Sequence, residues 1–391
     1  MSHTLITNIG LLVTNDASHD GTPLGLVHDA AILIGDGKIE WVGSSAEAPK
    51  GEIPEVFDAH KMCVIPGFVD SHNHLVFAGD RSAEFSARMK GEKYTAGGIN
   101  YTVGQTRSAS TEALKANAGR LVGEAHASGT TTLEIKSGYG LTINDEVRSL
   151  EIAANFTDET TFLGAHIVPS EFANSPEDYL SLVTGPMLDG IASKAKWIDV
   201  FSDRGAFNPD QTRRILSAGI AKGLKPRLHA NQLEQGEGIA IGVEFDAASV
   251  DHISHFTDAD IGLLAGSNTV ATFLPGAEFS TRSNYPDARR MLEAGVTVAL
   301  ASDCNPGSSF TNNISFIIAL AVREMFFSPE QALWSATAGG AAALRRGDIG
   351  ALTQGMNADF SILSSPSYIH LAYRPGVNQI EQVWRNGTRI K

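Results

Sequence analysis

Four side chains in this sequence have the types and the placement to hold one metal ion. His72 and His74 stand two residues apart, and in an extended segment residues i and i+2 point to the same side. Imidazole is a ligand for zinc and for iron, and a carboxylate completes such a set. His229 and Asp303 are the candidates for the third and fourth ligands.

The chemistry expected of such a site is hydrolysis. A bound metal ion lowers the pKa of water toward neutrality and so supplies hydroxide at physiological pH. Asp303 is expected to ligate the ion and also to carry a proton from the water to the leaving nitrogen. His252 is expected to orient the water by a hydrogen bond. Spacing alone does not decide which of these two residues is the general base, so both assignments stay open.

The middle of the chain must position these residues. Short β-branched runs alternate there with Ala/Leu/Glu/Arg-rich helical stretches, which predicts a parallel sheet covered by helices. Eight such units in about 280 residues fit a closed TIM (β/α)8 barrel, with a doubly wound open sheet as the alternative. The expected strands are residues 63–69, 130–135, 161–165, 197–201, 224–228, 248–251, 269–274 and 297–301.

The ends of these strands favour the barrel. In a parallel barrel, all side chains that follow the strands meet at one rim, whereas an open sheet spreads them along an edge. Seven of the eight expected strands run into polar residues that suit a site. These residues are His72 and His74, Lys136 and Tyr139, His166, Asp203, His229, His252, and Asp303.

The two chain ends differ from the middle. Both are rich in β-branched residues, and both contain hairpin turn signals, Gly35-Asp36-Gly37 and Asn386-Gly387. β-rich runs are expected at residues 4–13 and 30–42, the second broken by the turn at Gly35-Asp36-Gly37, and strands are expected at residues 360–363 and 380–384. We therefore predict a small β-sandwich-like domain composed of residues 1–62 and 346–391, and a barrel domain of residues 63–345.

Composition narrows the class of protein. The 391 residues carry a net charge of −14, which argues against a nucleic-acid-binding or acidic-membrane surface. Two cysteines, Cys63 and Cys304, exclude a disulfide framework and fit a reducing compartment. Neither a secretory signal nor a bilayer-spanning run is apparent. A cytoplasmic enzyme with a small-molecule substrate is expected.

Six segments carry longer motifs around these residues: 66–81, 134–141, 163–166, 229–232, 249–252 and 302–308. The Lys-Ser-Gly-Tyr-Gly run at 136–140 and the Asp-Cys-Asn-Pro-Gly run at 303–307 are the most specific. Together they resemble the imidazolonepropionase family of the amidohydrolase superfamily, over nearly the whole chain.

The resemblance implies a reaction. The ring C–N bond of 4-imidazolone-5-propanoate would be hydrolysed to N-formimidoyl-L-glutamate in histidine degradation. One zinc or iron ion per chain would be held by His72, His74, His229 and Asp303. A homodimer is expected, with no nucleic-acid or membrane partner.

The resemblance also implies the ligand contacts. Arg81 would offer a planar fork of donors to the propanoate carboxylate. His166 would donate a hydrogen bond to the ring carbonyl, in a catalytic role. Further substrate contacts are expected at Tyr139, Gln232 and Ser308, and product contacts at Asn305 and Gly307.

Three alternatives remain. A deaminase of the same superfamily generally has Glu three residues after the strand-five histidine, where this chain has Gln232, so proton transfer would fall to Asp303 and His252. A binuclear hydantoinase-like enzyme would need a carboxylated lysine. Lys136 is the one candidate, but it follows the second strand and is expected to be structural. A non-catalytic metal-binding scaffold would need neither the ligand set nor the substrate contacts.

Two departures from the family pattern leave questions open. Asp203 stands where Glu is frequent, which puts any role at that rim position in doubt. The segment around residues 96–98 looks shorter than in many members and is expected to alter the entrance.

Overall fold

The computed structural model describes residues 3–51, 53–92 and 98–391. Its internal contacts divide the chain into two compact units. One consists of Met1–Asp70, Glu124–Thr132 and Asn313–Lys391, and the other of Ser71–Gly123 and Leu133–Asn312. The domain limits predicted at residues 62–63 and 345–346 remain a prediction. Residues 96 and 97 of the shortened segment lie outside the described ranges.

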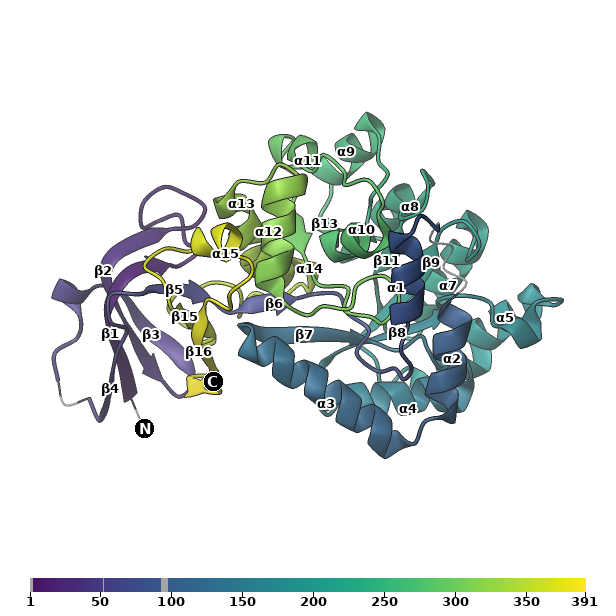
Figure 1. Ribbon diagram of the computed structural model, residues 1–391, viewed down its shortest axis with the longest axis horizontal. Helices are drawn as coiled ribbons and strands as arrows, with labels where there is room; N and C mark the ends of the chain where they lie inside the picture. The colour runs from purple at the N-terminus through teal and green to yellow at the C-terminus, as the bar shows by residue number, and fades with distance from the viewer. Residues whose placement is uncertain (1–2, 52, 93–97) are drawn as a thin grey trace. The chain divides into compact units, whose positions relative to one another are not determined.

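Strands from both chain ends form one sheet, as predicted (Figure 1). The order is β17-β16-β15-β5-β1-β2-β3, with β4 paired to β1. The hairpin between β2 and β3 turns at Asp36 and Gly37, whose φ angles of 48° and 76° suit a type I′ turn. The strands are β1 His3–Val13, β2 Leu26–Gly35, β3 Lys38–Ser44, β4 Glu55–Asp58, β5 Cys63–Pro66, β15 Phe360–Leu363, β16 Ile380–Arg385 and β17 Thr388–Arg389.

The core of this sheet, called the terminal core below, is apolar throughout. It includes Ile6, Ile32 and Phe360, each with no exposed surface, together with Trp384. The rings of Phe360 and Trp384 stack with centroids 5.4 Å apart. Burial of such side chains is the main favourable term in folding, so this sheet is stabilised by its apolar residues.

The second sheet is parallel and follows chain order, β14-β13-β12-β11-β9-β8-β7-β6, with β10 paired to β9. A doubly wound sheet would reverse direction at a switch point, so the TIM barrel prediction is confirmed. The strands are β6 Phe68–Asp70, β7 Thr130–Lys136, β8 Glu159–Ala165, β9 Trp197–Ser202, β10 Lys225–Pro226, β11 Leu228–Ala230, β12 Ser249–His252, β13 Val270–Phe273 and β14 Val298–Leu300.

Two expected strands are each divided in the structure: residues 224–228 divide between β10 and β11 of the parallel sheet, and residues 63–69 divide between two sheets. Residues 63–69 form two strands in two sheets: β5 pairs with β1 and β15, whereas β6 belongs to the parallel sheet. The break falls at Gly67, where a Cβ atom would lie 2.3 Å from the Thr131 side chain. The sequence run is uniformly apolar on both sides of this glycine, so composition could not reveal the change of sheet.

The barrel closes beyond its strands. The segment after β6 accepts a hydrogen bond at His72 O from Asp303 N (2.9 Å), and His74 N donates to Cys304 O (2.9 Å). On its other side Lys136 N donates to Asn73 O (3.0 Å). The backbone bonds that complete the ring therefore also bring His72 and His74 beside Asp303.

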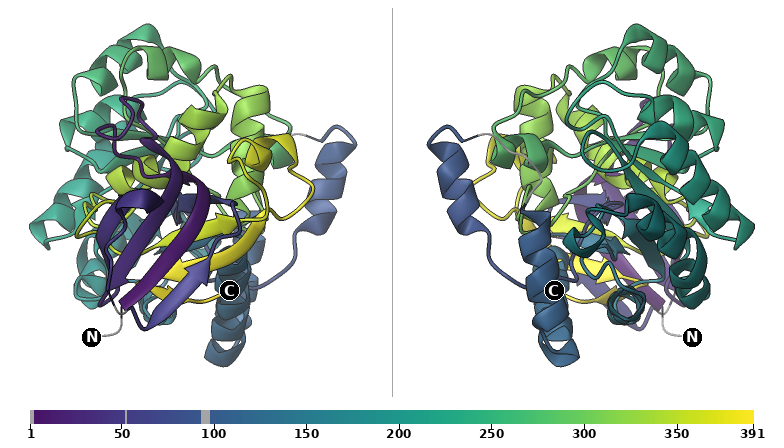
Figure 2. Two further views of the ribbon diagram at one scale, coloured as in Figure 1. Left: turned by 90° about the vertical axis from the view of Figure 1, so that its left-hand side faces the viewer. Right: turned by 90° about the vertical axis from the view of Figure 1, so that its right-hand side faces the viewer.

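Helices follow the parallel strands, and Figure 2 shows those coloured teal to green in an arc outside them. Several begin at side-chain caps, such as the capping box of Asn208 and Gln211 at α7. The helices are α1 Ser82–Met89, α2 Ile99–Ser108, α3 Thr111–Ala127, α4 Ile143–Ala153, α5 Pro176–Leu182, α6 Leu188–Ile191, α7 Pro209–Ala221, α8 Gly238–Glu244, α9 Asp258–Ala265, α10 Pro275–Thr281, α11 Arg289–Glu293, α12 Ile314–Glu324, α13 Pro329–Trp334, α14 Gly340–Ala343 and α15 His370–Tyr373.

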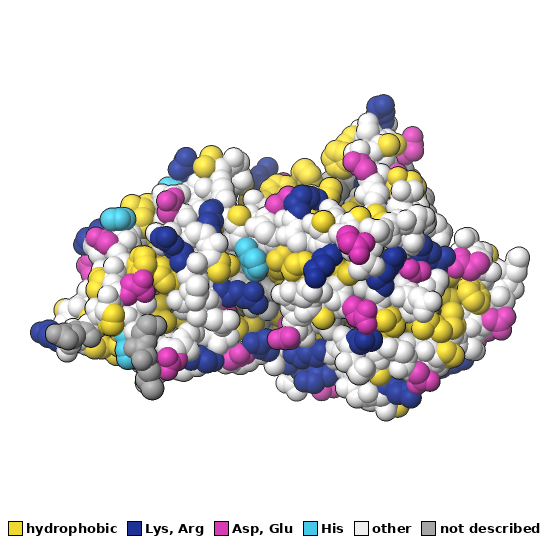
Figure 3. All heavy atoms as spheres, turned by 90° about the horizontal axis from the view of Figure 1, so that it is seen from below, with side chains coloured by type: hydrophobic (Ala, Val, Ile, Leu, Met, Phe, Trp, Pro, Cys, Tyr) yellow, Lys and Arg dark blue, Asp and Glu magenta, His cyan; other side chains and the backbone are white. Residues whose placement is uncertain are grey.

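Basic and acidic side chains are interspersed over the face seen in Figure 3. Among the described helices, none combines the length and the apolar composition that a membrane crossing requires.

Candidate metal centre

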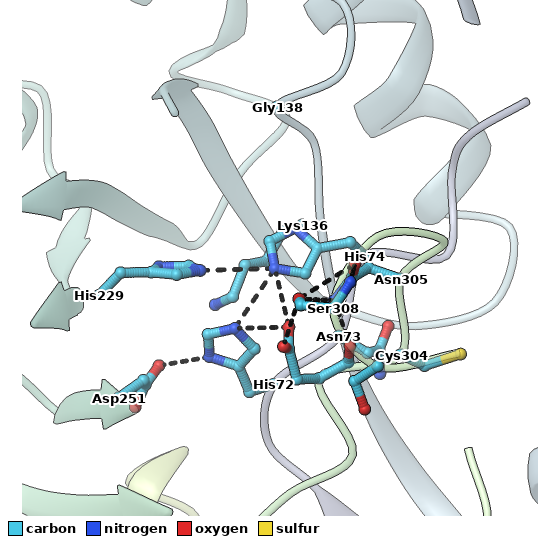
Figure 4. Close-up of polar contacts among 12 residues, drawn as sticks. His72, Asn73, His74, Lys136, Gly138, His229, Asp251, Cys304, Asn305 and Ser308 are labelled. Atoms are coloured by element: carbon cyan, nitrogen blue, oxygen red, sulfur yellow. Dashed lines mark hydrogen bonds and ion pairs between the residues drawn. The ribbon is translucent and has the colours of Figure 1, made fainter. Parts of the chain in front are cut away.

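Three imidazoles and one carboxylate converge at the rim of the barrel. His74 Nε2 lies 3.3 Å from His72 Nε2 and 3.4 Å from His229 Nε2. Asp303 Oδ1 lies 3.6 Å from His72 Nε2 and 3.5 Å from His74 Nε2. Figure 4 shows the three labelled rings directed toward one another. The structure thus brings together the four residues that the sequence predicted as ligands.

These distances suit a metal ion. Four ligand atoms at about 2.0–2.2 Å around a tetrahedral centre are separated by about 3.3–3.6 Å. Burial lowers the pKa of His72 and His74 well below the usual value, so each ring is neutral and keeps a lone pair for an ion. Burial also raises the pKa of the Asp303 carboxyl well above its usual value, a cost that a cation at this point would remove.

His252 is a fifth member of the cluster. Its ring nitrogen lies within 4.8 Å of those of His72 and His229, and its ring centroid is 5.3 Å from that of His229. Burial lowers its pKa well below the usual value, so it is neutral as well. Geometry alone therefore allows His252 to contact either the ion or a water beside it.

Carboxylates hold two of the ligand rings from behind. Asp251 Oδ2 lies 2.7 Å from His72 Nδ1, and Asp199 Oδ1 lies 3.0 Å from His229 Nδ1. A neutral imidazole that donates its Nδ1–H presents Nε2 as the free ligand atom. These two acids fix the orientation and the tautomer that metal binding needs.

The two acids belong to a buried charge network that also contains Glu134, Lys136 and Arg227. Lys136 Nζ lies 2.9 Å from Asp199 Oδ2 and 3.0 Å from Glu134 Oε1, and Arg227 Nη2 lies 3.3 Å from Asp251 Oδ2. All five side chains have no exposed surface. Lys136 is ion-paired with two acids, which agrees with the structural role expected of it and leaves a bridging carboxylated lysine without support.

Most of this network was missed by the sequence analysis. The sequence indicates Lys136 as a strand-end residue, whereas Glu134, Asp199 and Arg227 lie inside expected strands and are not indicated as part of a site. The available signal was a charged residue inside each of three runs otherwise suited to a barrel interior.

Burial by itself would raise the pKa of Asp251, but Arg227 and Lys136 outweigh that effect and the pKa is lowered. The pKa of Lys136 is raised, because Asp199 and Glu134 outweigh the effect of its burial. Asp251 and Lys136 are therefore charged in the folded protein.

Above the cluster lies an inner pocket with a cavity of about 20 Å³. Every predicted site residue lines it except His72, which lies deeper, and Gly307. Ile99 and Phe201 are apolar wall residues that the sequence did not indicate. The lining is His74, Arg81, Ile99, Tyr139, His166, Phe201, His229, Gln232, His252, Asp303, Asn305 and Ser308.

The structure reverses the hydrogen-bonding role expected of His166. Its Nδ1 lies 2.9 Å from the Gly138 carbonyl oxygen, which can only accept, so Nδ1 carries the proton. Burial lowers the pKa of His166 to about 4, so the ring is neutral near pH 7. Nε2 then holds a lone pair and accepts a hydrogen bond, so donation to a ring carbonyl is not open to this tautomer.

Arg81 is held by an acid that the sequence did not indicate. Its Nε and Nη2 lie 2.9 and 2.8 Å from the two carboxylate oxygens of Glu84. Its guanidinium packs on Gly307, where a Cβ atom would lie 2.1 Å from Nη1. A side chain at 307 would therefore displace the Arg81 guanidinium from this position, and one edge of the guanidinium is already occupied by Glu84.

The loop after β14 is held by its own side chains. Asn305 Oδ1 accepts from the backbone N–H groups of Gly307 and Ser308, both at 2.8 Å, and its Nδ2 donates to Asp303 O. Ser308 Oγ lies 3.2 Å from Asp303 Oδ2. Asn305 shapes the loop, and Ser308 positions the carboxylate.

Asp203 has a clear structural role. Its Oδ2 accepts from the backbone N–H groups of Gln232 and Leu233 at 2.7 and 2.8 Å, and its Oδ1 accepts from Arg204 N at 2.7 Å. The shorter acid at this position therefore joins the loops after β9 and β11 and holds the one that carries Gln232.

Comparison with known proteins identifies the family. The model of the amidohydrolase family matches residues 63–390. The imidazolonepropionase of Streptomyces griseus is 59% identical over 391 residues, covering 100% of both chains. That of Salinispora arenicola is 62% identical over 389 residues, covering 99% of this chain and 98% of the relative. The chain belongs to the amidohydrolase family, among the imidazolonepropionases.

Solved structures agree on the fold. A variant of atrazine chlorohydrolase from Arthrobacter aurescens, complexed with zinc and atraton, superposes with a TM-score of 0.75 at 17% identity, covering 99% of this chain and 95% of that one. Guanine deaminase from C. acetobutylicum with bound guanine gives a TM-score of 0.72 at 16% identity, covering 100% of both. At such identities the likeness establishes the amidohydrolase fold and no more.

Proposed function

We propose that this chain hydrolyses the ring C–N bond of 4-imidazolone-5-propanoate to N-formimidoyl-L-glutamate, as an imidazolonepropionase of histidine degradation. The observation that carries the proposal is the convergence of His72, His74, His229 and Asp303 below a pocket whose walls hold the family's substrate-contacting residues. Relatives 59–62% identical over the full chain bear that name.

The proposed cofactor is one zinc or iron ion per chain, held by the same four residues. When bound, the ion supplies Lewis acidity, which lowers the pKa of water toward neutrality. The neutral imidazoles and the buried Asp303 are the donor types that either metal accepts. Asp199 and Asp251 orient two of the rings from behind.

The proposed proton carrier is Asp303. Its Oδ1 faces the histidine nitrogens while its Oδ2 lies 3.2 Å from Ser308 Oγ, so the carboxylate is held with one oxygen on each side. In this position it can take a proton from the attacking water and return it to the leaving nitrogen. His252, neutral and within the same cluster, orients the water.

The residues proposed to contact the substrate are those that line the inner pocket or the loop after β14. Arg81 and Tyr139 face the propanoate and ring, and Gln232 contributes a neutral amide from the loop after β11. His166 accepts a hydrogen bond from a ring N–H at Nε2. Asn305 and Gly307 shape the loop on which Ser308 stands, and they contact the product through that loop.

No observation favours a deaminase over this function. Gln232 stands three residues after His229, where a deaminase of this superfamily needs a proton-carrying Glu, and an amide does not titrate. A homodimer in the cytoplasm remains our expectation, and light scattering of the purified protein measures the first part of it.

The deciding experiment is turnover by metal-quantified protein. Freshly made imidazolonepropanoate should lose its ultraviolet absorbance, N-formimidoylglutamate should be identified by mass, and about one metal ion per chain should be found. A His229→Ala variant should lose both metal and turnover. Full metal occupancy without turnover would remove the substrate assignment and leave the metal site standing.

A further inference from the structure

A second, larger pocket opens beside the inner one at the same rim. Its cavity is about 370 Å³, against about 20 Å³ for the inner pocket. Gln232 lines both pockets, so the two adjoin. This outer pocket is lined by Arg88, Gly91, Glu92, Arg204, Gln232, Leu233, His255, Thr281, Arg282 and Ser283.

The lining of the outer pocket is cationic in a strongly acidic protein. Among the described residues of the lining, three are arginines, Arg88, Arg204 and Arg282, and one is an acid, Glu92, while the whole chain carries a net charge of −14. Acids outside the lining offset part of this charge. Glu234 lies 3.0 Å from Arg204, and Glu84 lies 3.8 Å from Arg88.

Arg282 is the most available of the three. Within the described residues its recorded contact is a hydrogen bond from Nη1 to Met89 O at 2.9 Å, with no ion pair to an acid. A guanidinium has five N–H donors, so most of them remain for a ligand. Its neighbours across the pocket include the titratable groups of Glu92 and His255.

Helices α1 and α10 hold Arg88 and Arg282 in place, because each arginine donates a hydrogen bond to a backbone carbonyl of the other helix. Arg88 of α1 donates from Nε to Ser280 O of α10 at 3.1 Å, while Arg282, which caps α10, donates to Met89 O of α1. Arg282 takes a left-handed φ of 59° at the position after the helix, where glycine or asparagine is favoured. A residue with a Cβ atom takes that conformation only at a cost, and here it directs the Arg282 side chain toward α1.

Arg88 of α1 links the outer pocket to the inner pocket through Gly307. Arg88 Nη2 donates to Gly307 O at 2.7 Å, and Gly307 packs against the Arg81 guanidinium. Arg81 donates from Nε and Nη2 to the Glu84 carboxylate. A substrate carboxylate that reaches Arg81 therefore finds one edge of the guanidinium already hydrogen-bonded. Gly307 therefore contacts one arginine of each pocket, Arg88 of the outer pocket and Arg81 of the inner pocket.

We propose that the outer pocket is a docking subsite for the carboxylate of small anionic ligands, which holds the substrate before it passes Gln232 into the inner pocket. The proposal rests on the proposed function for the identity of the substrate. The docking site itself requires only a small carboxylate of the size that the cavity admits. A local cationic pocket also offsets the repulsion that an acidic protein exerts on an anion.

The test is binding rather than turnover, with glutarate as the probe. Isothermal titration of the metal-loaded protein at low salt should detect glutarate, and Arg282→Gln should weaken it about 5- to 10-fold. Arg204→Gln should weaken it less, because Glu234 already partners that arginine. Arg214→Gln is the matched control, since Arg214 is exposed and paired with Glu177 at 2.9 Å but lies outside the pocket lining.

Two further measurements separate the inner and outer sites. In an Arg81→Lys background the binding event and its sensitivity to Arg282→Gln should persist, and raising the salt to about 0.3 M should weaken it, because exposed charges are screened. Glutarate that fails to bind, or that binds equally well to Arg282→Gln, would overturn the docking site. Retained docking without turnover of imidazolonepropanoate would instead contradict the proposed function alone.

Discussion

The terminal core and the buried charge network are equally inaccessible to water but opposite in chemistry. The first is built from side chains such as Ile32 and Phe360, and the second from three acids and two bases without exposed surface. Burial of apolar area stabilises the fold directly, whereas burial of charges costs free energy unless every charge is paired.

The difference shows what each region is for. With all five groups ionised, the network carries one net negative charge, because three acids face two bases. Asp303 adds a second, so a divalent cation would bring the region to neutrality. Such an arrangement is poor at stabilising a fold and well suited to holding a metal ion, whereas the terminal core has no group that could bind one. Five substitutions can break or sharpen this contrast.

The largest effect should come from His229→Ala. Removing one of four ligands should abolish stoichiometric metal binding and reduce kcat by more than about 10³-fold, since the ion supplies several kcal/mol of transition-state stabilisation. Metal analysis and turnover are the measurements. His60→Ala, at an exposed histidine, should change neither. Retention of one ion per chain in the His229 variant would mean that another residue, such as His252, completes the site.

The next effect should be on stability, from Lys136→Met. It leaves Glu134 and Asp199 buried without their shared cation, and the free energy of unfolding should fall by about 3–5 kcal/mol. Urea unfolding of the metal-loaded protein measures this change. Lys222→Met removes an exposed lysine paired with Asp189 and should cost less than about 1 kcal/mol. Equal costs for the two variants would show that the network is not under electrostatic constraint.

A comparable loss of stability, with a different signature, should follow Ile32→Ala in the terminal core. The cavity should cost about 2–5 kcal/mol. Metal affinity and KM should be unchanged at temperatures where the variant is folded, because this core contains no ligand and no network residue. A shift in metal affinity in this variant would contradict the view that the terminal core stabilises the fold and that the charge network serves the metal site.

A smaller effect on metal affinity is expected from Asp251→Asn. The amide keeps the shape but loses the charge that holds the proton on His72 Nδ1. Loss of such a partner lowers metal affinity about 10- to 100-fold. Competition with a chelator measures it. The unfolding free energy of the metal-free protein should fall as well, because Arg227 loses a buried partner, so affinity is measured at a temperature where the variant is folded. An unchanged metal affinity would mean that the charge of Asp251 does not contribute to metal binding by His72.

The smallest effect should come from Ser308→Ala. It removes one hydroxyl from Asp303 Oδ2, a contact worth about 0.5–1.5 kcal/mol, and should lower kcat about 2- to 10-fold with the metal content unchanged. Ser308→Thr keeps the hydroxyl and should restore most of the rate. If kcat is unaltered in the alanine variant, Asp303 is positioned by the metal alone.

Local features were readable from the sequence. The hairpin at Asp36-Gly37, the terminal strands and the alternation that predicts a barrel depend on backbone dihedral preference and hydrophobic periodicity, which act over a few residues. The spacing of His72 and His74 also acts locally, because two side chains on one face of an extended segment need no distant partner. The resemblance to a family then supplied the substrate, which spacing could not.

Only the tertiary structure decided the remainder. Asp251 is 179 residues from the His72 that it orients, and Glu84 takes an edge of Arg81 that the sequence had assigned to a ligand. The apolar run of residues 63–69 divides between two sheets, and the His166 tautomer depends on the carbonyl of Gly138. Each of these outcomes depends on the distance through space between particular groups, whether they are 179 residues apart, as His72 and Asp251 are, or neighbours, as Arg81 and Glu84 are, and neither composition nor periodicity contains that distance.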